Sequence, residues 1–212
     1  MHMDYFGKFE KALDSIHGGS RSCKETFSEF CLLARMCFQQ AISFDRKREE
    51  EILKIQGASK KPDGYAEALA VLANALQHKT GDFLGAWAEH SGVLYGKRGQ
   101  FFTPYNVSQL MAKIIFGKPQ KRGRPLPINE PACGAGSMVI AAFETLRELG
   151  YGPRDFYVLA QDIDALCVNM AYIQCTLLGI PAIVRHGDTL LNQIYCEYPT
   201  LPFVMSFPCG VR

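Results

Sequence analysis

Three acidic side chains, Glu130, Asp162 and Asp188, each stand where a short apolar run ends in the second half of the sequence. A carboxylate in such a place can accept hydrogen bonds from the hydroxyl or amino groups of a ligand. It can also cap the helix that follows, and Asp164 is placed to do that. Any one of the three could be a simple cap, but three acids at equivalent positions favour a binding site.

The first of these acids opens the string Glu130-Pro131-Ala132-Cys133-Gly134-Ala135-Gly136. Glycines let the backbone turn sharply and let a ligand lie directly against it, and free amides at a helix start can meet an electron-rich group. A plain strand–helix turn is the alternative for a bare G-x-G. The string does not match the dinucleotide-binding fingerprint, because Val139 stands where that fingerprint has its third glycine.

The elements that must position these residues alternate between strand and helix. Alternation of this kind is typical of a parallel sheet, and in such a sheet the carboxyl ends of the strands meet at one edge, where ligands bind. A last apolar segment, Phe203–Phe207, is expected as the fourth strand. The other expected elements are strands at 126–130, 156–161 and 182–186 and helices at 137–149 and 164–178.

The first half, residues 1–95, is predicted to be a helical region, and residues 96–212 a second domain. The clearest helix runs from Thr26 to Ser43, where apolar residues recur at three- and four-residue steps. Glycine and charge cluster at Gly92–Gly99, a predicted boundary. The string Gln100-Phe101-Phe102-Thr103-Pro104 follows, in which Thr103 can cap a helix that starts at Pro104.

Composition places the chain among globular proteins, with 48% hydrophobic and 21% charged residues and a formal net charge of +2. The segment from Gly96 to Arg124 holds seven of the 23 basic side chains and no acid. The rest of the chain holds the other 16 basic side chains and all 21 acidic ones, so its net charge is −5. This segment is expected either to contact phosphates or to be a solvated basic loop. The eight cysteines show no spacing typical of a metal site and suit a reducing, cytoplasmic setting.

The glycine-rich string and the Q-F-F-T-P string together resemble the S-adenosylmethionine-binding motifs of the amino-methylating DNA methyltransferases. The similarity is greatest to the modification subunits of type I restriction systems and to related plasmid-borne methylases. It covers roughly residues 95–210. It implies a Rossmann-like S-adenosylmethionine-dependent methyltransferase fold, here a partial parallel sheet preceded by the helical region, and adenine-N6 methylation of DNA as the activity.

The resemblance also implies which residues hold S-adenosylmethionine. Asp162 would accept both ribose hydroxyls and Ile163 would offer an apolar face to adenine. Asp188 would accept from the adenine amino group, and the amide of Thr189 would meet a ring nitrogen. The Q-F-F-T-P string would pack beside the methionine end, and its cofactor-binding residues would be Phe102, Thr103 and Pro104. The cofactor-binding residues of the glycine-rich string would be Glu130, Pro131, Ala132, Cys133, Gly134 and Gly136.

The catalytic motif of this family reads N/D/S-P-P-Y/F/W, and the corresponding string here is Ser206-Phe207-Pro208-Cys209. Ser206 and Pro208 match it and are the candidate catalytic residues. Phe207 replaces the first proline, and Cys209 replaces the aromatic residue that stacks on the flipped base. A non-catalytic subunit that binds the cofactor or DNA is therefore the alternative. A nucleotide-dependent oxidoreductase is a third hypothesis, which the missing third glycine and the two strings disfavour.

Partners follow from the same observations. DNA is expected to bind through residues 96–124. The chain ends soon after the expected fourth strand, so an open sheet edge is expected to be covered by a second copy or by a partner subunit. No apolar run approaches the roughly 20 residues that a membrane span needs, and no membrane association is expected.

Overall fold

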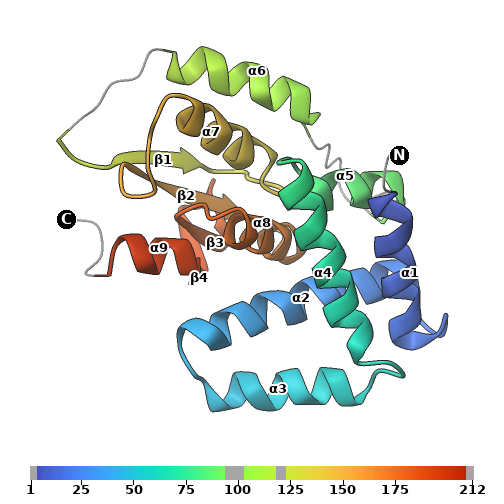
Figure 1. Cartoon of the computed structure of the whole chain (residues 1–212). Helices are drawn as coiled ribbons and strands as arrows, with labels where there is room; N and C mark the ends of the chain where they lie inside the picture. The colour runs from blue at the N-terminus through green and yellow to red at the C-terminus, as the bar shows by residue number, and fades with distance from the viewer. Residues whose placement is uncertain (1–3, 94–102, 118–122, 209–212) are drawn as a thin grey trace.

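The computed structural model of the chain describes residues 4–93, 103–117 and 123–208 (Figure 1). Its centre is a four-stranded sheet with the order β1-β2-β3-β4, in which β1, β2 and β3 are parallel. This confirms the α/β fold class and the first three strands. The strands are β1 (Leu126–Glu130), β2 (Phe156–Asp162), β3 (Ala182–Asp188) and β4 (Gln193–Pro199).

Two crossover helices join the parallel strands: α7 (Ser137–Glu148) connects β1 to β2, and α8 (Ala165–Leu177) connects β2 to β3. The chain passes from β1 to its neighbour β2 and then from β2 to β3, so both connections advance in the same direction across the sheet. Because such crossovers are right-handed, both helices lie on one face. Alternate residues of β2 accordingly point into this layer, and Phe156, Val158 and Ala160 are buried in the same core cluster as residues of both helices.

The expectation of a fourth strand at Phe203–Phe207 is wrong. Most of that segment belongs to a short helix, α9 (Leu201–Ser206), which begins after Thr200 because the Thr200 hydroxyl accepts a hydrogen bond from the backbone N–H of Phe203 and Pro202 stands in the first turn. The fourth strand is β4, which comes earlier in the chain and returns antiparallel to β3. A hairpin therefore makes this edge of the sheet.

The first half of the chain is helical, as expected. Its longest helix begins with a capping box formed by Ser22 and Glu25. The core between the N-terminal helices contains packed aromatic rings, among them Phe9, Phe27 and Trp87. The helices are α1 (Tyr5–His17), α2 (Cys23–Ile42), α3 (Arg46–Gly57), α4 (Asp63–His78) and α5 (Phe83–His90).

Helix α8 lies between these helices and the sheet (Figure 1). Cys167, Met170 and Ile173 pack into the core of the N-terminal helices, whereas Val168, Ala171, Tyr172 and Cys175 belong to the core of the sheet. The two halves thus meet along one buried helix. The domain division between residues 95 and 96 stays a prediction. Among the described residues, no helix is long and apolar enough to cross a membrane.

Helix α6 (Tyr105–Phe116) covers α7. Its buried side is narrow and holds Ser108 and Ala112. The opposite side exposes large apolar side chains, with Leu110, Ile114 and Ile115 each more than half exposed. A helix that leaves this much apolar surface uncovered is typical of a protein that binds a partner there.

Candidate functional site

The three acids predicted from the sequence lie at one end of the sheet, where the three parallel strands finish. Glu130 ends β1, Asp162 ends β2 and Asp188 ends β3. These strands run parallel, so their carboxyl ends lie side by side. The Thr189 hydroxyl donates to the carbonyl oxygen of Pro131 at 2.6 Å, which joins the end of β3 to the loop after β1. The structure therefore brings these predicted site residues together.

Asp162 holds the glycine loop in place. One carboxylate oxygen, Oδ2, accepts from the backbone N–H of Gly134 at 2.8 Å, and Oδ1 accepts from the N–H of Asp164 at 2.9 Å. Asp164 in turn caps α8, as expected. The sequence argument gave Asp162 a role towards a ligand only. Its second role, as an acceptor for the loop amide, depends on the distance between two strand ends and has no signal in the local sequence.

The two glycines of the loop both have a positive φ, +53° at Gly134 and +102° at Gly136. L-residues rarely adopt these conformations, so the loop needs glycine at both positions. Gly136 also brings the start of α7 close to α8, because a Cβ there would lie 3.5 Å from Ala171. In the part of the chain that the structure describes, no side chain caps the N-terminus of α7. The first amides of this helix are therefore available to a ligand.

Glu130 is half-buried beside this loop. Burial raises the pKa of its carboxyl group, the negative charge of Asp162 raises it further, and a weak hydrogen bond from the N–H of Ala132, 3.4 Å away, opposes both effects. Ionised Glu130 therefore costs the fold free energy. An acid kept at such a cost is typical of a functional site.

Replacing Glu130 by Gln is expected to raise the thermal unfolding midpoint near pH 7. The folded chain holds the Glu130 proton more tightly than the unfolded chain, so this residue lowers stability as pH rises from the usual pKa of a glutamate to the raised one. The gain from Glu130→Gln should shrink as pH falls to 4 and below, where Glu130 becomes protonated in both the folded and the unfolded state. Unfolding curves of both proteins across this range test it, and a pH-independent difference would contradict it.

Thr103 and Pro104 lie beside the glycine loop. The hydroxyl of Ser137, the first residue of α7, donates to the carbonyl oxygen of Thr103 at 3.3 Å and also contacts the hydroxyl of Ser108 at 2.9 Å. The prediction that Thr103 caps the next helix is wrong, because Pro104 holds the cap position and no side chain caps α6. Phe102 lies outside the described residues.

Sequence reasoning missed Ser137, although a serine directly after a G-x-G string at a helix start is a recognisable signal. It also missed His186, whose Nε2 lies 3.2 Å from the carbonyl oxygen of Ile163. The side chain of Ile163 itself is 59% exposed next to Asp162. It is free to contact a flat apolar group.

The candidate catalytic residues, Ser206 and Pro208, lie elsewhere. Helix α9 starts beside the first residue of β3, since the N–H of Thr200 donates to the carbonyl of Ala182 at 2.9 Å. The ring of Phe207 packs 5.9 Å from that of Tyr157, the second residue of β2. Both contacts are at the amino ends of the strands. Ser206 and Pro208 are therefore not brought to the acids, and their catalytic role stays a prediction.

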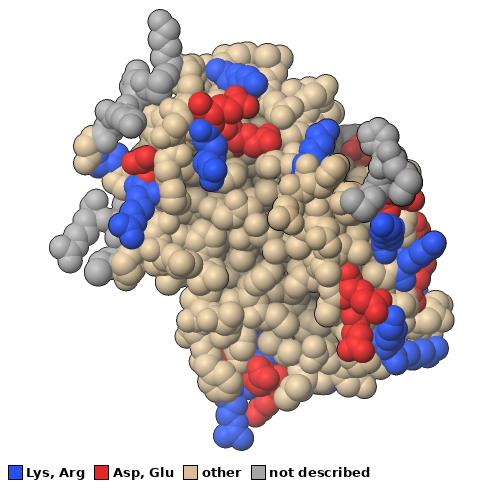
Figure 2. Space-filling model, viewed as in Figure 1, with Lys and Arg blue, Asp and Glu red and all other residues tan. Residues whose placement is uncertain are grey.

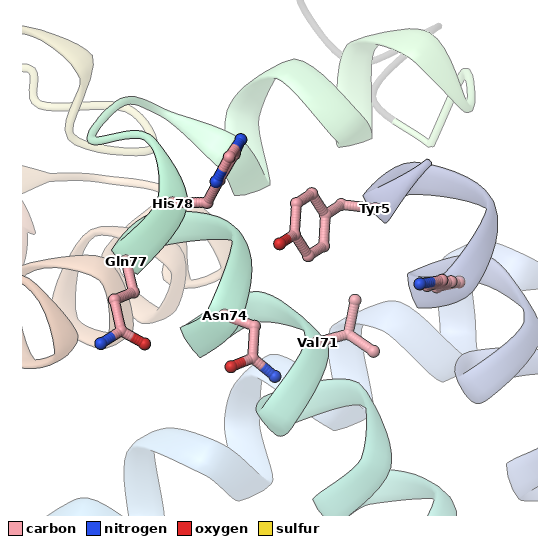
Figure 3. A pocket seen from close by; sticks show the side chains of 6 residues that line it. Tyr5, Val71, Asn74, Gln77 and His78 are labelled. Carbon is pink, nitrogen blue, oxygen red and sulfur yellow. The ribbon is translucent and has the colours of Figure 1, made fainter. Parts of the chain in front are cut away.

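The basic segment is described only in part, because Lys97, Arg98, Lys118, Lys121 and Arg122 lie outside the described residues. Arg124 is exposed, and Lys113 pairs with Glu148 at 3.6 Å. Figure 2 shows basic and acidic side chains intermixed over the face in view. A hollow on the N-terminal helices, about 690 Å³ in volume, is lined by Tyr5 and Lys8 of α1 and by residues of α4 (Figure 3), and none of the predicted site residues that the structure describes lines it.

Comparison with known proteins places this geometry in context. The profile of the N-6 DNA methylases matches residues 81–209. Two methylase subunits of type I restriction enzymes from Methanocaldococcus jannaschii are similar. MjaIX is 25% identical over 126 residues, which are 59% of this chain and 21% of that protein. MjaVIII is 34% identical over 99 residues, 45% of this chain and 16% of that protein.

A solved structure shares the fold. It is a class I S-adenosylmethionine-dependent methyltransferase from Listeria monocytogenes, with 20% sequence identity and a TM-score of 0.53. The match covers 90% of this chain and 55% of that structure. The chain thus spans about half the length of this structure and about a fifth or less of the two methylase subunits.

Proposed function

Because the chain belongs to the family of N-6 DNA methylases, we propose that it binds S-adenosylmethionine at the carboxyl ends of β1, β2 and β3. The observation that carries the proposal is the hydrogen bond that the backbone N–H of Gly134 donates to Asp162, because it joins the acid at the end of β2 to the glycine loop after β1. Such a loop exposes backbone to a ligand, and the acid beside it retains lone pairs for hydroxyl groups.

Each part of the site has a proposed partner on the cofactor. Asp162 accepts from the ribose hydroxyls, and the exposed side chain of Ile163 lies against the adenine ring. Asp188 accepts from the adenine amino group, and the amide of Thr189 meets a ring nitrogen. The loop Glu130–Gly136, with Phe102, Thr103 and Pro104 alongside, holds the methionine end.

Isothermal titration calorimetry with S-adenosylmethionine and with its demethylated product tests this proposal directly. Both ligands carry the same ribose and adenine, so both should give heat with a one-to-one stoichiometry. Adenosine alone should bind more weakly, because it lacks the methionine end. The absence of heat with either full ligand, on a sample whose circular dichroism shows it to be folded, would refute the cofactor site.

The proposed methyl acceptor is the amino group of adenine in DNA, as the family implies. The placement of Ser206 and Pro208 favours a second candidate, a subunit that binds cofactor or DNA without transferring the methyl group. A measurement of methyl incorporation into DNA separates the two candidates. A cytoplasmic location stays a prediction from the sequence.

DNA binding is proposed to involve the basic segment 96–124, and it should depend on salt. Neutralised phosphates release counterions, so the logarithm of the affinity falls with the logarithm of salt concentration by about 0.9 per phosphate contact. Changing four basic residues of this segment to alanine should flatten that slope by about 2–4. The four are Lys118, Lys121, Arg122 and Arg124.

Fluorescence anisotropy with a mixed-sequence duplex between about 50 and 200 mM salt measures this slope. The control changes four exposed lysines of the N-terminal helical half (Lys8, Lys11, Lys54 and Lys60), which removes the same net charge elsewhere. Equal slopes for the wild type and the segment variant would show that this segment is a solvated loop.

We also propose that a partner subunit or a second copy covers the exposed side of α6 and an open edge of the sheet. Leu110, Ile114 and Ile115 present an apolar surface on α6, and β1 is one of the two edge strands of the described sheet. Size-exclusion chromatography with light scattering tests self-association. Leu110→Glu should return a self-associating chain to the monomer mass.

A further inference from the structure

A second hollow lies at the other side of the molecule from α6, between α2, α3 and β4. Its volume is about 560 Å³, within the range of small-molecule sites. Three basic side chains line it, Arg35 from α2 and Lys47 and Arg48 from α3, together with Tyr198 of β4. Among the described residues, none of those assigned above to the cofactor or to DNA lines it.

Among the described residues, the groups that hold Arg35 in position are all neutral. Its Nε–H donates to Oδ1 of Asn169 at 2.6 Å, one Nη donates to Oε1 of Gln39, and the guanidinium carbon lies 4.3 Å above the ring of Tyr198. An arginine carries five N–H donors, so these bonds leave donors unused. The guanidinium is thus fixed in orientation and still able to bind.

Arg48 is bound in the same way. Its Nη1 donates to the carbonyl oxygen of Ser43 at 3.0 Å and contacts Oε1 of Gln40 at 3.3 Å, both neutral acceptors. Neither Arg35 nor Arg48 forms an ion pair in the part of the chain that the structure describes. The charge of Arg48 also acts on Arg35: burial lowers the pKa of the Arg35 guanidinium, and the nearby positive charge of Arg48 adds to that effect.

Three acids, Asp45, Glu51 and Glu197, also line the hollow, and none of them forms an ion pair with Arg35 or Arg48 among the described residues. Asp45 caps α3 by accepting from the N–H of Arg48 at 2.8 Å. Glu197 pairs with Arg185 at 2.6 Å. Glu51 is exposed on α3 and forms none of the ion pairs found among the described residues. Two guanidinium groups therefore share a concave site with no carboxylate bound to either of them.

The hollow on α1 and α4 offers a contrast. It is larger, but among the described residues that line it Lys8 is the one Lys or Arg, and Asn74 and Gln77 project separately from α4 (Figure 3). It brings no two arginines together. The size of a hollow thus does not single out a site here, whereas convergent charge does.

We propose that the hollow between α2, α3 and β4 binds the phosphate group of a small molecule through Arg35 and Arg48. Guanidinium groups match phosphate oxygens in charge and in the spacing of their donors, and Lys47 adds a further positive charge at the rim. The concave shape favours a free phosphate compound over the rod of a DNA duplex. The site is separate from the cofactor site and does not depend on the function proposed above.

Calorimetry with sodium tripolyphosphate, at an ionic strength balanced with sodium chloride, tests the proposal. The wild type should bind it, and Arg48→Gln should weaken binding at least tenfold. Arg46→Gln is the matched control, because Arg46 stands on the same helix, is exposed and pairs with Glu50. It should bind like the wild type. Arg35→Gln is a second variant, used if circular dichroism shows that it folds.

With tripolyphosphate, three results would overturn the proposal: no heat with the wild type, an affinity of Arg48→Gln equal to that of the wild type, or a loss of affinity in Arg46→Gln equal to that in Arg48→Gln. A duplex oligonucleotide that binds through Arg48 when tripolyphosphate does not would also overturn it, since the ligand would then be a nucleic acid. A Kd that depends on Arg48 and not on Arg46 supports a phosphate site in this hollow.

Discussion

Asp162→Asn should weaken the binding of S-adenosylmethionine by about 10- to 100-fold. The carboxylate loses its charge, and the amide nitrogen that replaces one oxygen cannot accept a hydrogen bond. Hydrogen bonds to charged groups contribute about 1.5–3 kcal/mol, and every 1.4 kcal/mol is tenfold in affinity. Two effects act together, because Asp162 also holds the amide of Gly134 and hence the shape of the glycine loop.

Asp155→Asn is the matched control for this prediction. Asp155 also accepts from a glycine amide, that of Gly152 at 2.7 Å, but it precedes β2 whereas Asp162 ends it. This variant should keep the wild-type affinity. Calorimetry on the three proteins decides, and an unchanged Kd in Asp162→Asn would show that the cofactor does not bind at this end of the strands.

The second large effect is an expected absence of turnover: the 212-residue chain alone should transfer no more methyl to DNA than a sample without protein. Methyl transfer needs the reacting atoms within about 3–3.5 Å of each other. Phe207 packs on Tyr157, and Tyr157 stands five residues before Asp162 on β2. At the usual rise of a strand, these two residues are about 16 Å apart.

The residue types point the same way. Stacking of a base on an aromatic ring is worth about 1–3 kcal/mol, and Cys209 stands where the family has that ring. Incubation with tritium-labelled S-adenosylmethionine and mixed-sequence DNA measures incorporation, with a complete methylase subunit of the family as positive control. Label in adenine well above background would show that Ser206 and Pro208 suffice.

The sequence predicted the parallel part of the fold because its signals are local. The strands at 126–130, 156–161 and 182–186 lie between helix signals at regular intervals, and the structure confirms them within two residues. Phe203–Phe207 failed because a short apolar run fits a strand or a buried helix equally well. The cap at Thr200 decided in favour of the helix. Residues 193–199 alternate too weakly between polar and apolar to reveal β4.

The site could be predicted as a set of residues but not as a network. The acids were found because strand ends in a parallel sheet meet at one edge. The contacts of Asp162 with the glycine loop, of Ser137 with the Thr103 carbonyl and of Thr189 with Pro131 join residues 28 or more positions apart. No local pattern encodes such contacts. The cost of ionised Glu130 likewise depends on burial, which appears only when the chain is folded.

Helix α8 has a consequence for how the chain unfolds. One of its sides belongs to the core of the N-terminal helices and the other to the core of the sheet, so neither core is complete without it. The two halves should therefore melt in a single cooperative transition, and the amides of α8 should exchange hydrogen with solvent among the slowest in the molecule. A chain cut between residues 95 and 96 would leave each fragment with an uncovered apolar side. Each fragment alone should therefore aggregate, whereas the two fragments should fold together when they are mixed in denaturant and the denaturant is then removed.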